Sequence, residues 1–391
     1  GLALPAMFVL PCLPCLSCPA CHVLVEIPGL WEYNNLNWNV RPGFLVLAEE
    51  GNPSCQSAFP GGQMENGNCL VSVLCTAYNH EEYIRSALEG FVNQKTDFAF
   101  EVLVNDDAST DKTAEIIREY EEKYPHIIRA FYHEENQFSK GIGYVYENIF
   151  YPNARGKYLA FCEGDDCWTD ESKLRRQAEF MEAHPDYSAC VHNTLLHYCD
   201  GSRPDEPLVR HEEDMDLPFE LIIKGPNNAY HTSSLFARKE LMTQTPDFYR
   251  AATAHGFADY AWGLMLGLGG KLRFINRTMS LYRICSNQCA WSSGVDGCYD
   301  KLKGFVRGKA EMLRAFLPHA PEEYRALTEQ VILEREFELM YIEGRDREQR
   351  REPYRSILRR QSFSYRLKNF VKSYFPGVQR AYRRRQGYGD Y

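Results

Sequence analysis

Strand-like and helix-like segments alternate from residue 69 to about residue 295, and this alternation limits the fold more than any other feature of the chain. Short apolar runs bounded by polar residues predict strands, and apolar residues spaced three and four apart predict helices. The expected strands are residues 70–76, 100–104, 127–132 and 158–162, and the expected helices are residues 81–93, 111–123 and 171–183. Alternation of this length favours βαβ units, and hence an α/β fold with a mostly parallel, doubly wound sheet.

The composition argues against several classes of protein. A net charge of −9 argues against nucleic acid as the main partner. No run of 18 apolar residues is free of proline and charge, so we expect no membrane span. The 14 cysteines are scattered, and most lie in apolar runs, which favours reduced thiols in the cytoplasm over a disulfide framework.

Residues 1–68 form an extension that differs from the rest of the chain. They include no lysine, no aspartate and one arginine, and their apolar residues follow no steady period. We expect little packed structure there, and we expect Met64 to be the true start of the protein. Four cysteines are spaced two residues apart and could hold zinc or an iron–sulfur cluster. These are Cys12, Cys15, Cys18 and Cys21.

Residues 296–391 are expected to form a helical C-terminal region, which leaves residues 69–295 as the α/β domain. From Tyr354 to Gln386 the chain has ten lysine or arginine residues and no acid, interleaved with aromatic and aliphatic residues. One interpretation is a solvated helical tail. The other is docking on an anionic membrane surface, which would bring the protein to the inner face of the plasma membrane.

Three carboxylates crowd into four residues just after the expected strand at residues 158–162. They are Glu163, Asp165 and Asp166. Carboxylates this close repel one another, and burial would raise their pKa values, so a cation among them would stabilise the group. Oxygen ligands favour a hard divalent ion such as Mg²⁺ or Mn²⁺. The alternative is an acidic turn in which Asp170 caps the following helix.

Polar residues also follow the first and second expected strands. In such sheets ligands bind outside the carboxyl ends of the strands, so Thr76, Asp107 and the acidic stretch are expected to face one crevice. Asp107 can accept a hydrogen bond from a base or a ribose hydroxyl, and Tyr78 could cover a nucleobase. Ser109 or Asp111 is expected to cap the next helix.

Together these segments resemble glycosyltransferase family 2. Residues 71–111 resemble that family's opening pattern of strand, T-x-Y-N, helix, strand and D-D-x-S-x-D, and residues 163–168 resemble its E-G-D-D-Y-W metal-binding motif. The resemblance covers residues 69 to about 295. It implies a GT-A fold, a nucleoside-diphosphate sugar donor, a divalent cation and inversion at the anomeric carbon.

The resemblance also implies roles for single residues. Thr76, Tyr78 and Asp107 match the nucleoside-binding positions. Asp165 and Asp166 match the pair that binds metal and diphosphate, with Asp166 as the direct ligand. Such enzymes assist the attack of a hydroxyl acceptor with a carboxylate that removes its proton.

The later part of the α/β domain supplies the remaining candidates. Asp259, in the segment G-F-A-D-Y-A-W that ends at Trp262, matches the catalytic base, although it could equally be a helix cap. His231 and Trp262 are expected on the acceptor side. Arg283 is expected to hold donor phosphate or to pair with a structural acid. Where many relatives have histidine after Y-R, this chain has Cys285, a poor ligand for Mg²⁺.

By family analogy, the acceptor is expected to be a glycan or a lipid-linked molecule in bacterial surface polysaccharide or glycolipid synthesis. Two alternatives remain at this point. One is a nucleotidyltransferase of similar fold, which would need a basic phosphate-binding loop near the first strand. The other is a catalytically silent GT-A scaffold.

Overall fold

The structure is a computed structural model, and it describes residues 69–225, 229–284 and 299–375. The expectations for residues 1–68, including Met64 and the four spaced cysteines, lie outside the described residues, as does Cys285.

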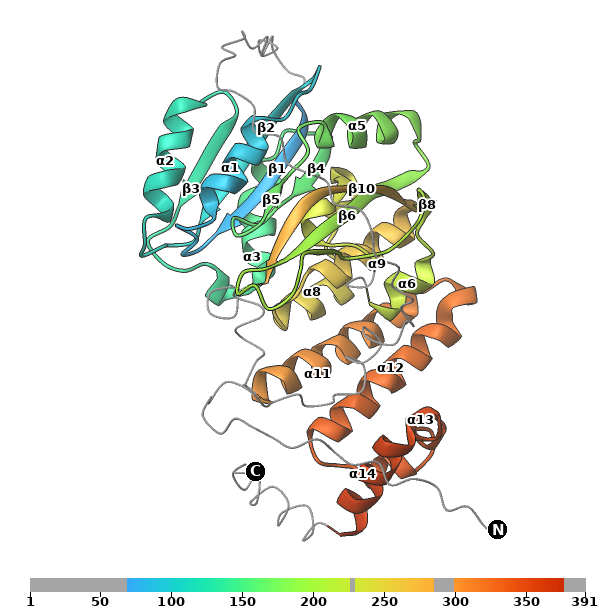
Figure 1. Cartoon of the computed structure of the whole chain (residues 1–391). Coiled ribbons are helices and arrows are strands. Elements are labelled where there is room, and N and C mark those ends of the chain that lie inside the picture. Colours follow the sequence, from blue (N-terminus) through green and yellow to red (C-terminus); the bar gives the residue numbers. More distant parts are fainter. Residues whose placement is uncertain (1–68, 226–228, 285–298, 376–391) are drawn as a thin grey trace, which may run out of the picture. The chain divides into compact units, whose positions relative to one another are not determined.

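The described strands form a single sheet in the order β3-β2-β1-β4-β9-β6-β10-β5, with β7 beside β6 and β8 beside β10 (Figure 1). Their bounds are β1 (Cys69–Ala77), β2 (Ala99–Asp106), β3 (Ile128–Tyr132), β4 (Tyr158–Phe161), β5 (Cys167–Trp168), β6 (Tyr187–Tyr198), β7 (Glu206–Pro207), β8 (Met215–Asp216), β9 (Phe236–Arg238) and β10 (Lys271–Ile284).

The predicted parallel sheet is confirmed for β3, β2, β1 and β4, which all run the same way. Beyond β4 the sheet is mixed, because β9 runs antiparallel to both β4 and β6. β10 is parallel to β6 and antiparallel to the short strand β5. The α/β class is therefore correct, and the sheet is less parallel than the sequence predicted.

Helices cover both faces of the sheet, and a helical region follows it (Figure 1). The helices that belong to the α/β part are α1 (Ile84–Val92), α2 (Thr113–Lys123), α3 (Ile142–Val145), α4 (Tyr151–Asn153), α5 (Lys173–Ala183), α6 (Phe219–Lys224), α7 (Lys239–Met242), α8 (Asp247–Ala254) and α9 (Asp259–Gly269). The C-terminal helices are α11 (Tyr299–Phe316), α12 (Glu322–Ile342), α13 (Arg355–Arg360) and α14 (Phe363–Tyr374).

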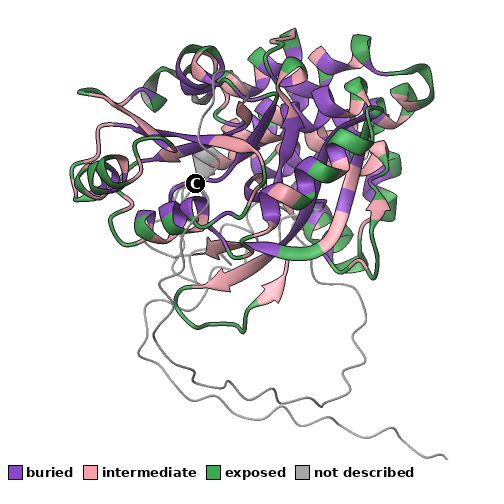
Figure 2. Ribbon diagram, turned by 90° about the horizontal axis from the view of Figure 1, so that it is seen from above, coloured by how far each residue is buried: buried purple, intermediate pink, exposed green. Residues whose placement is uncertain are grey.

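The core lies on the two faces of the sheet, because successive strand residues point to opposite sides. Val73 and Cys75 of β1 pack in one cluster with α1, α2 and α5, whereas Leu74 packs in another with α8 and α9. Figure 2 shows this pattern, with buried residues along the strands and exposed residues on the outer sides of the helices. Packing on both faces of the sheet therefore fixes the positions of the carboxyl ends of β1, β2 and β4.

The helices α11 and α12 share the core of the α/β part. Met312, Leu313 and Phe316 of α11 belong to the same apolar cluster as α8 and α9. A separate small cluster joins α12 to α13 and α14. Within the described segments, no helix combines the length and apolar character that crossing a bilayer requires.

Five of the described cysteines are free, and Cys199, directly after β6, is disulfide-bonded, so the prediction of reduced thiols does not hold for Cys199. The free cysteines are Cys69, Cys75, Cys162, Cys167 and Cys190.

Candidate active site

The acidic loop after β4 continues the register of β4 on β1. The Cys162 N–H donates to the Leu74 carbonyl oxygen at 3.2 Å, and the Gly164 N–H donates to the Thr76 carbonyl oxygen at 2.8 Å. A Cβ at Gly164 would lie 2.8 Å from a side-chain carbon of Ile84, so a larger residue would push the loop away from β1. Glycine at this position therefore brings the carboxylates to the end of the first strand.

The environment of this loop disfavours the ionised form of its carboxyl groups. Burial, together with the charge of Asp165, raises the pKa values of both Glu163 and Asp166. Asp166 is 2% exposed. The Glu163 Oε2 atom is buried and has no hydrogen-bond partner in the described part of the chain. Buried carboxylates that repel one another are stabilised by a cation, so these residues fit a hard divalent ion.

His231 lies beside Asp166, with its Nδ1 atom 3.6 Å from the Asp166 Oδ2 atom. The ring stacks on Tyr282 at 4.2 Å, and burial lowers the pKa of His231 to about 4, so it is neutral at physiological pH. Its Nδ1 atom accepts the Ser233 N–H at 3.2 Å, so the single lone pair of that nitrogen is already engaged within the chain. The sequence placed His231 on the acceptor side, whereas the structure places it at the acidic loop.

Within the described residues, no three acidic, histidine or cysteine side chains converge tightly enough to enclose a metal ion alone. Mg²⁺ commonly takes only one or two protein carboxylates and completes its shell with water and substrate phosphates. The chain's own ligands would be Asp166 and Asp165.

Arg283, near the end of β10, forms hydrogen bonds with the acidic loop. Its guanidinium donates to the Asp165 carbonyl oxygen at 2.7 Å and to the Ser86 Oγ atom at 2.9 Å. Its backbone N–H donates to the Asp166 carboxylate at 3.3 Å. Arg283 therefore lies next to the site, with its side chain already bound to protein oxygens. The Asp165 carboxylate lies 3.9 Å from the His80 ring.

Hydrogen bonds join the loop after β1 to the loop after β2. Asn79 has a left-handed backbone (φ 55°); its N–H donates to Ser109 Oγ, and its side chain accepts the Thr110 N–H. The Glu81 N–H donates to the Asp111 carboxylate at 3.0 Å. Tyr78 remains 45% exposed beside this link, where its ring is free to cover a planar ligand.

Asp107 anchors a third segment. Its carboxylate accepts the Gln137 N–H at 2.5 Å and the Phe138 N–H at 3.0 Å, and the side chain is buried. Its neighbour Asp106, the last residue of β2, is similarly buried. The Asp106 Oδ1 atom has no partner among the described residues, and burial raises the pKa of its carboxyl. The two aspartates differ in their hydrogen bonds, because the fold directs the N–H groups of Gln137 and Phe138 toward Asp107.

Asp259 is the first residue of α9, and its carboxylate accepts the N–H of Tyr260 at 2.9 Å. Burial raises the pKa of Asp259, and Lys309 on α11 partly offsets this. The charge of Asp259 contributes to the raised pKa of Glu163. Asp259 is therefore close enough to influence the charge of Glu163, although the two are almost a hundred residues apart in sequence.

Tyr230 is a site residue that the sequence did not reveal. Its side chain is 4% exposed, and its hydroxyl has no hydrogen-bond partner in the described segments. Burial and the charge of Asp259 raise the pKa of Tyr230, so the phenol stays protonated beside that carboxylate. No local sequence pattern identifies Tyr230, because its effect depends on Asp259, which lies on another element.

Trp262 lies in the core and not on an acceptor-facing surface. It is 2% exposed and packs on Phe161 and Tyr146, with ring centroids 4.9 Å and 4.7 Å away. Trp262 packs against Phe161 of β4, and the sequence had instead predicted a contact with the acceptor.

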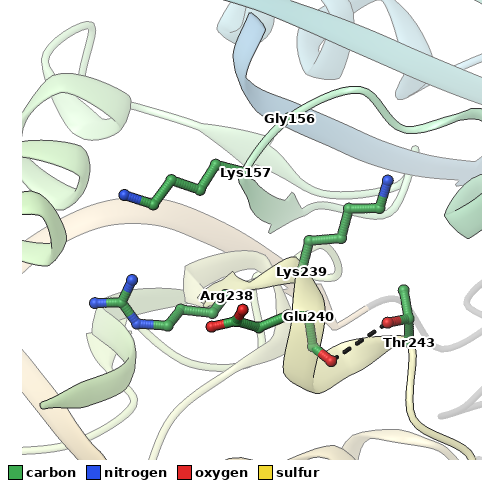
Figure 3. Close-up of a pocket in the computed structure, with 6 residues that line it drawn as sticks. All are labelled: Gly156, Lys157, Arg238, Lys239, Glu240 and Thr243. Atoms are coloured by element: carbon green, nitrogen blue, oxygen red, sulfur yellow. Dashed lines mark hydrogen bonds between the residues drawn. The ribbon is translucent and has the colours of Figure 1, made fainter. Parts of the chain in front are cut away.

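A cavity of about 330 Å³ lies elsewhere, at the amino end of β4 (Figure 3). Its cations are bound to the protein itself: Lys157 pairs with Glu182, and Arg238 donates to the Tyr187 carbonyl oxygen. Because ligands of such sheets bind at the carboxyl ends of the strands, this cavity is not the active-site candidate.

Comparison with known protein families matches residues 72–239 to the family described as Glycosyl transferase family 2. An uncharacterized protein of Mycobacterium tuberculosis is 34% identical over 214 residues, which cover 54% of this chain and 58% of that protein. The putative teichuronic acid biosynthesis glycosyltransferase TuaG of Bacillus subtilis is 36% identical over 118 residues, covering 30% of this chain and 44% of TuaG. The chain thus spans about half the length of the curated relatives it matches.

Among solved structures, S. aureus TarS 1-349 in complex with UDP-GlcNAc superposes with a TM-score of 0.51 and 18% identity. The match covers 70% of this chain and 73% of TarS 1-349. At this identity the likeness shows the fold, and it confirms the GT-A type of sheet that the sequence predicted.

Proposed function

Residues 72–239 belong to glycosyltransferase family 2, and from this premise we propose that the chain transfers a sugar from a nucleoside-diphosphate donor to a hydroxyl acceptor, with inversion and with Mg²⁺ or Mn²⁺ as cofactor. The proposal rests on one observation. The loop after β4 buries carboxylates that repel one another, with Asp166 2% exposed and the Glu163 Oε2 atom unpaired among the described residues, and a cation would stabilise them. A silent scaffold has no need of this costly arrangement.

The residues divide the work as follows. Tyr78 covers the nucleobase, while Thr76 and Asp107 hold the nucleoside at the ends of β1 and β2. Asp166 and Asp165 would hold the cation, which when bound would offset negative charge on the departing diphosphate. Arg283 fixes the backbone of the acidic loop, so the carboxylates are positioned before substrate arrives.

Asp259 supplies the base. As the acceptor hydroxyl oxygen attacks the anomeric carbon, the bond from that carbon to the diphosphate oxygen breaks and the hydroxyl proton passes to the Asp259 carboxylate. A pKa raised by burial makes this carboxylate a better proton acceptor than an exposed aspartate.

The acceptor and the pathway are inferred less directly. The printed name of TuaG places that relative in teichuronic acid biosynthesis. We propose by analogy a glycan or lipid-linked acceptor in bacterial surface polysaccharide or glycolipid synthesis. A cytoplasmic location remains a prediction of the sequence.

Binding tests the proposal before the acceptor is known. The full chain is screened against sugar nucleotides by thermal unfolding, with Mn²⁺ or with chelator. A donor present at about a hundred times its Kd stabilises the fold by about 2.7 kcal/mol, and this should require the cation. Asp166→Asn should abolish the cation-dependent shift and raise the stability of the protein without cation, because one buried repelling charge is gone.

The matched control is Asp97→Asn. It changes an exposed aspartate just before β2, at the amino ends of the strands and away from the acidic loop. It should bind donor as the wild type does. If no sugar nucleotide stabilises the wild type with Mn²⁺, or if Asp166→Asn behaves like the control, the enzyme proposal is wrong.

A further inference from the structure

The helix α14 buries polar side chains and exposes apolar ones. Its inner face presents Tyr365, Asn369 and Ser373, spaced four residues apart. Asn369 donates to the Gln349 side-chain oxygen at 2.6 Å and to the Asp346 carbonyl oxygen at 3.2 Å. The polar face is therefore fixed inward by hydrogen bonds, and the helix cannot rotate to hide its other side without breaking them.

The outer face of α14 is an apolar stripe. Its members, with their exposed fractions, are Phe363 (72%), Leu367 (50%), Phe370 (43%) and Tyr374 (55%). Spacings of four, three and four residues place them on one side of the helix. Contiguous exposed apolar surface of this kind marks an interaction site, because leaving it in water is unfavourable.

A cavity of about 340 Å³ lined by arginines adjoins this stripe, at α13 and α14. Its lining residues are Arg350, Arg355, Leu358, Arg359, Arg366 and Tyr374. The stripe and the cavity share Tyr374. They are also joined by Arg350, whose guanidinium lies 5.2 Å from the Phe370 ring centroid and 5.3 Å from that of Tyr374.

The positive charge of this cavity is not neutralised by any acid in the described part of the chain. Arg355, Arg359 and Arg366 are exposed, and none of them forms an ion pair with any residue that the structure describes. No acid occurs in the sequence between residues 354 and 386. The cavity therefore has room and charge for a phosphate group, and arginine binds phosphate with paired N–H donors.

The combination indicates which partner is bound. Phenylalanine and leucine on a helix face need an apolar medium, and the arginines beside them need phosphate. A bilayer of anionic phospholipid supplies both across one surface. RNA would satisfy the arginines but offers no apolar medium for Phe363 and Leu367.

We propose that α13 and α14 dock the protein on a membrane containing anionic phospholipid. The apolar stripe enters the boundary between head groups and acyl chains, and a lipid phosphate enters the arginine cavity. This inference does not depend on the proposed sugar transfer, because no residue of the acidic loop or of α9 takes part in it.

Vesicle flotation with the full chain tests the proposal. Vesicles of phosphatidylcholine alone are compared with vesicles that also contain phosphatidylglycerol, at low and at high salt. The wild type should bind the anionic vesicles, less so in high salt. Replacing Arg355, Arg359 and Arg366 by glutamine should weaken partitioning about fivefold per charge, roughly a hundredfold in all.

The matched control removes three exposed charges from the α/β part, at Lys123, Arg203 and Lys224, and should leave partitioning close to the wild-type value. Phe363→Ser with Leu367→Ser should weaken binding about tenfold or more at both salt concentrations, since it removes apolar rather than charged contacts. Unchanged thermal unfolding shows that each variant is folded.

Three results would overturn the proposal. They are equal binding to both kinds of vesicle, no binding to either, and equal loss in the arginine variant and its control. Two further arms separate other sources of the same chemistry. Release from vesicles by millimolar inorganic phosphate would indicate a site for free phosphate. Stronger binding to an RNA oligonucleotide than to anionic vesicles would indicate a nucleic-acid partner.

Discussion

At the scale of single residues, Lys173 shows how the fold supports the acidic loop from beneath. Its side chain is fully buried, its ammonium lies 3.9 Å from the Trp168 ring centroid, and it donates to the Gln177 side chain at 2.7 Å. Trp168 closes the acidic motif, and its indole N–H donates to the Ser233 carbonyl oxygen near His231. The lysine thus supports the residue that ties the acidic loop to the His231 segment.

Burial lowers the pKa of Lys173 from 10.5 to about 7. The folded protein therefore gives up this proton at lower pH than the unfolded chain, so stability rises with pH between these two values. The gain from this group is at most about 5 kcal/mol, from about 1.4 kcal/mol per unit of pKa. Lys173→Met should remove this part of the slope, measured by urea unfolding at about pH 7 and about pH 9.5.

The exposed Lys123→Met is the control and should keep the wild-type slope. If Lys173→Met and the wild type gain the same free energy of unfolding over this interval, Lys173 is charged throughout and its burial has another compensation.

Asp259 gives a prediction about chemistry. Asp259→Asn should lower kcat by roughly 10²–10⁴-fold while leaving the Kd of the donor nucleotide near its wild-type value, because an amide cannot accept the acceptor's proton. Asp247→Asn changes an exposed aspartate at the first position of α8 and should leave kcat unchanged. Equal turnover by Asp259→Asn and the wild type would remove Asp259 as the base.

Residue types at the site could largely be predicted from the sequence, but their neighbours could not. The acids of the loop were identified because their spacing is unusual and local. Tyr230 was missed because its buried hydroxyl, unpaired among the described residues, results from packing by other elements, and the unpaired Oδ1 atom of Asp106 has the same origin. His231 was identified, but its position beside Asp166 depends on the turn after residue 230, which has no sequence signature.

At the scale of elements, the strands and helices agree with the sequence in kind and differ at their ends. α1 begins at Ile84 and α2 at Thr113, two to three residues after the expected starts. The expected capping by Asp111 holds in altered form, since its carboxylate accepts both the Thr113 and the Glu81 N–H groups. The loop between strand and helix is thus stabilised by a partner loop, which a single-segment pattern does not show.

The contact between α1 and β5 gives a prediction at this scale. A Cβ at Gly90 of α1 would lie 2.8 Å from the Trp168 carbonyl oxygen and 3.1 Å from its nitrogen. Backbone atoms cannot rotate away, so Gly90→Ala should displace β5 and cost about 1–3 kcal/mol of folding free energy. Because β5 follows Asp166 directly, cation-dependent donor binding should weaken as well.

Gly304 of α11 is the matched control, because a Cβ there would meet nothing within 4 Å. Gly304→Ala should stabilise the protein by about 0.5–1 kcal/mol through helix propensity. A stabilising Gly90→Ala would mean that α1 can shift on the sheet without cost. Denaturant unfolding and donor titration measure both effects.

At the scale of the whole molecule, the described residues contain two large apolar clusters, one on each face of the sheet, and one small cluster. One large cluster joins the sheet to α8, α9, α11 and α12, and the small cluster joins α12, α13 and α14. Phe316 is fully buried in the first, and Tyr365 belongs to the second. A mutation in the first cluster should destabilise the whole α/β part, whereas a mutation in the second should affect only α13 and α14.

Phe316→Ala should lower the free energy of unfolding of the α/β part by about 3–5 kcal/mol, because the cavity lies in the shared core. Tyr365→Ala should instead speed amide exchange in α13 and α14 while leaving exchange in β1, β2 and β4 unchanged. Hydrogen exchange with denaturant unfolding separates these outcomes. Faster exchange throughout the sheet in Tyr365→Ala would show that the chain has a single core.

The sequence by itself determined the alternating α/β pattern, the helical C-terminal region and the motif that identifies the family, because each depends on residue spacing along one segment. Only the tertiary structure decided which half of the sheet is mixed, where Asp259 and His231 meet the acidic loop, and that α14 turns its apolar side outward. These features depend on which surfaces of distant elements meet, and on the burial and loss of hydration that follow. The spacing of residues along a chain does not encode that information locally.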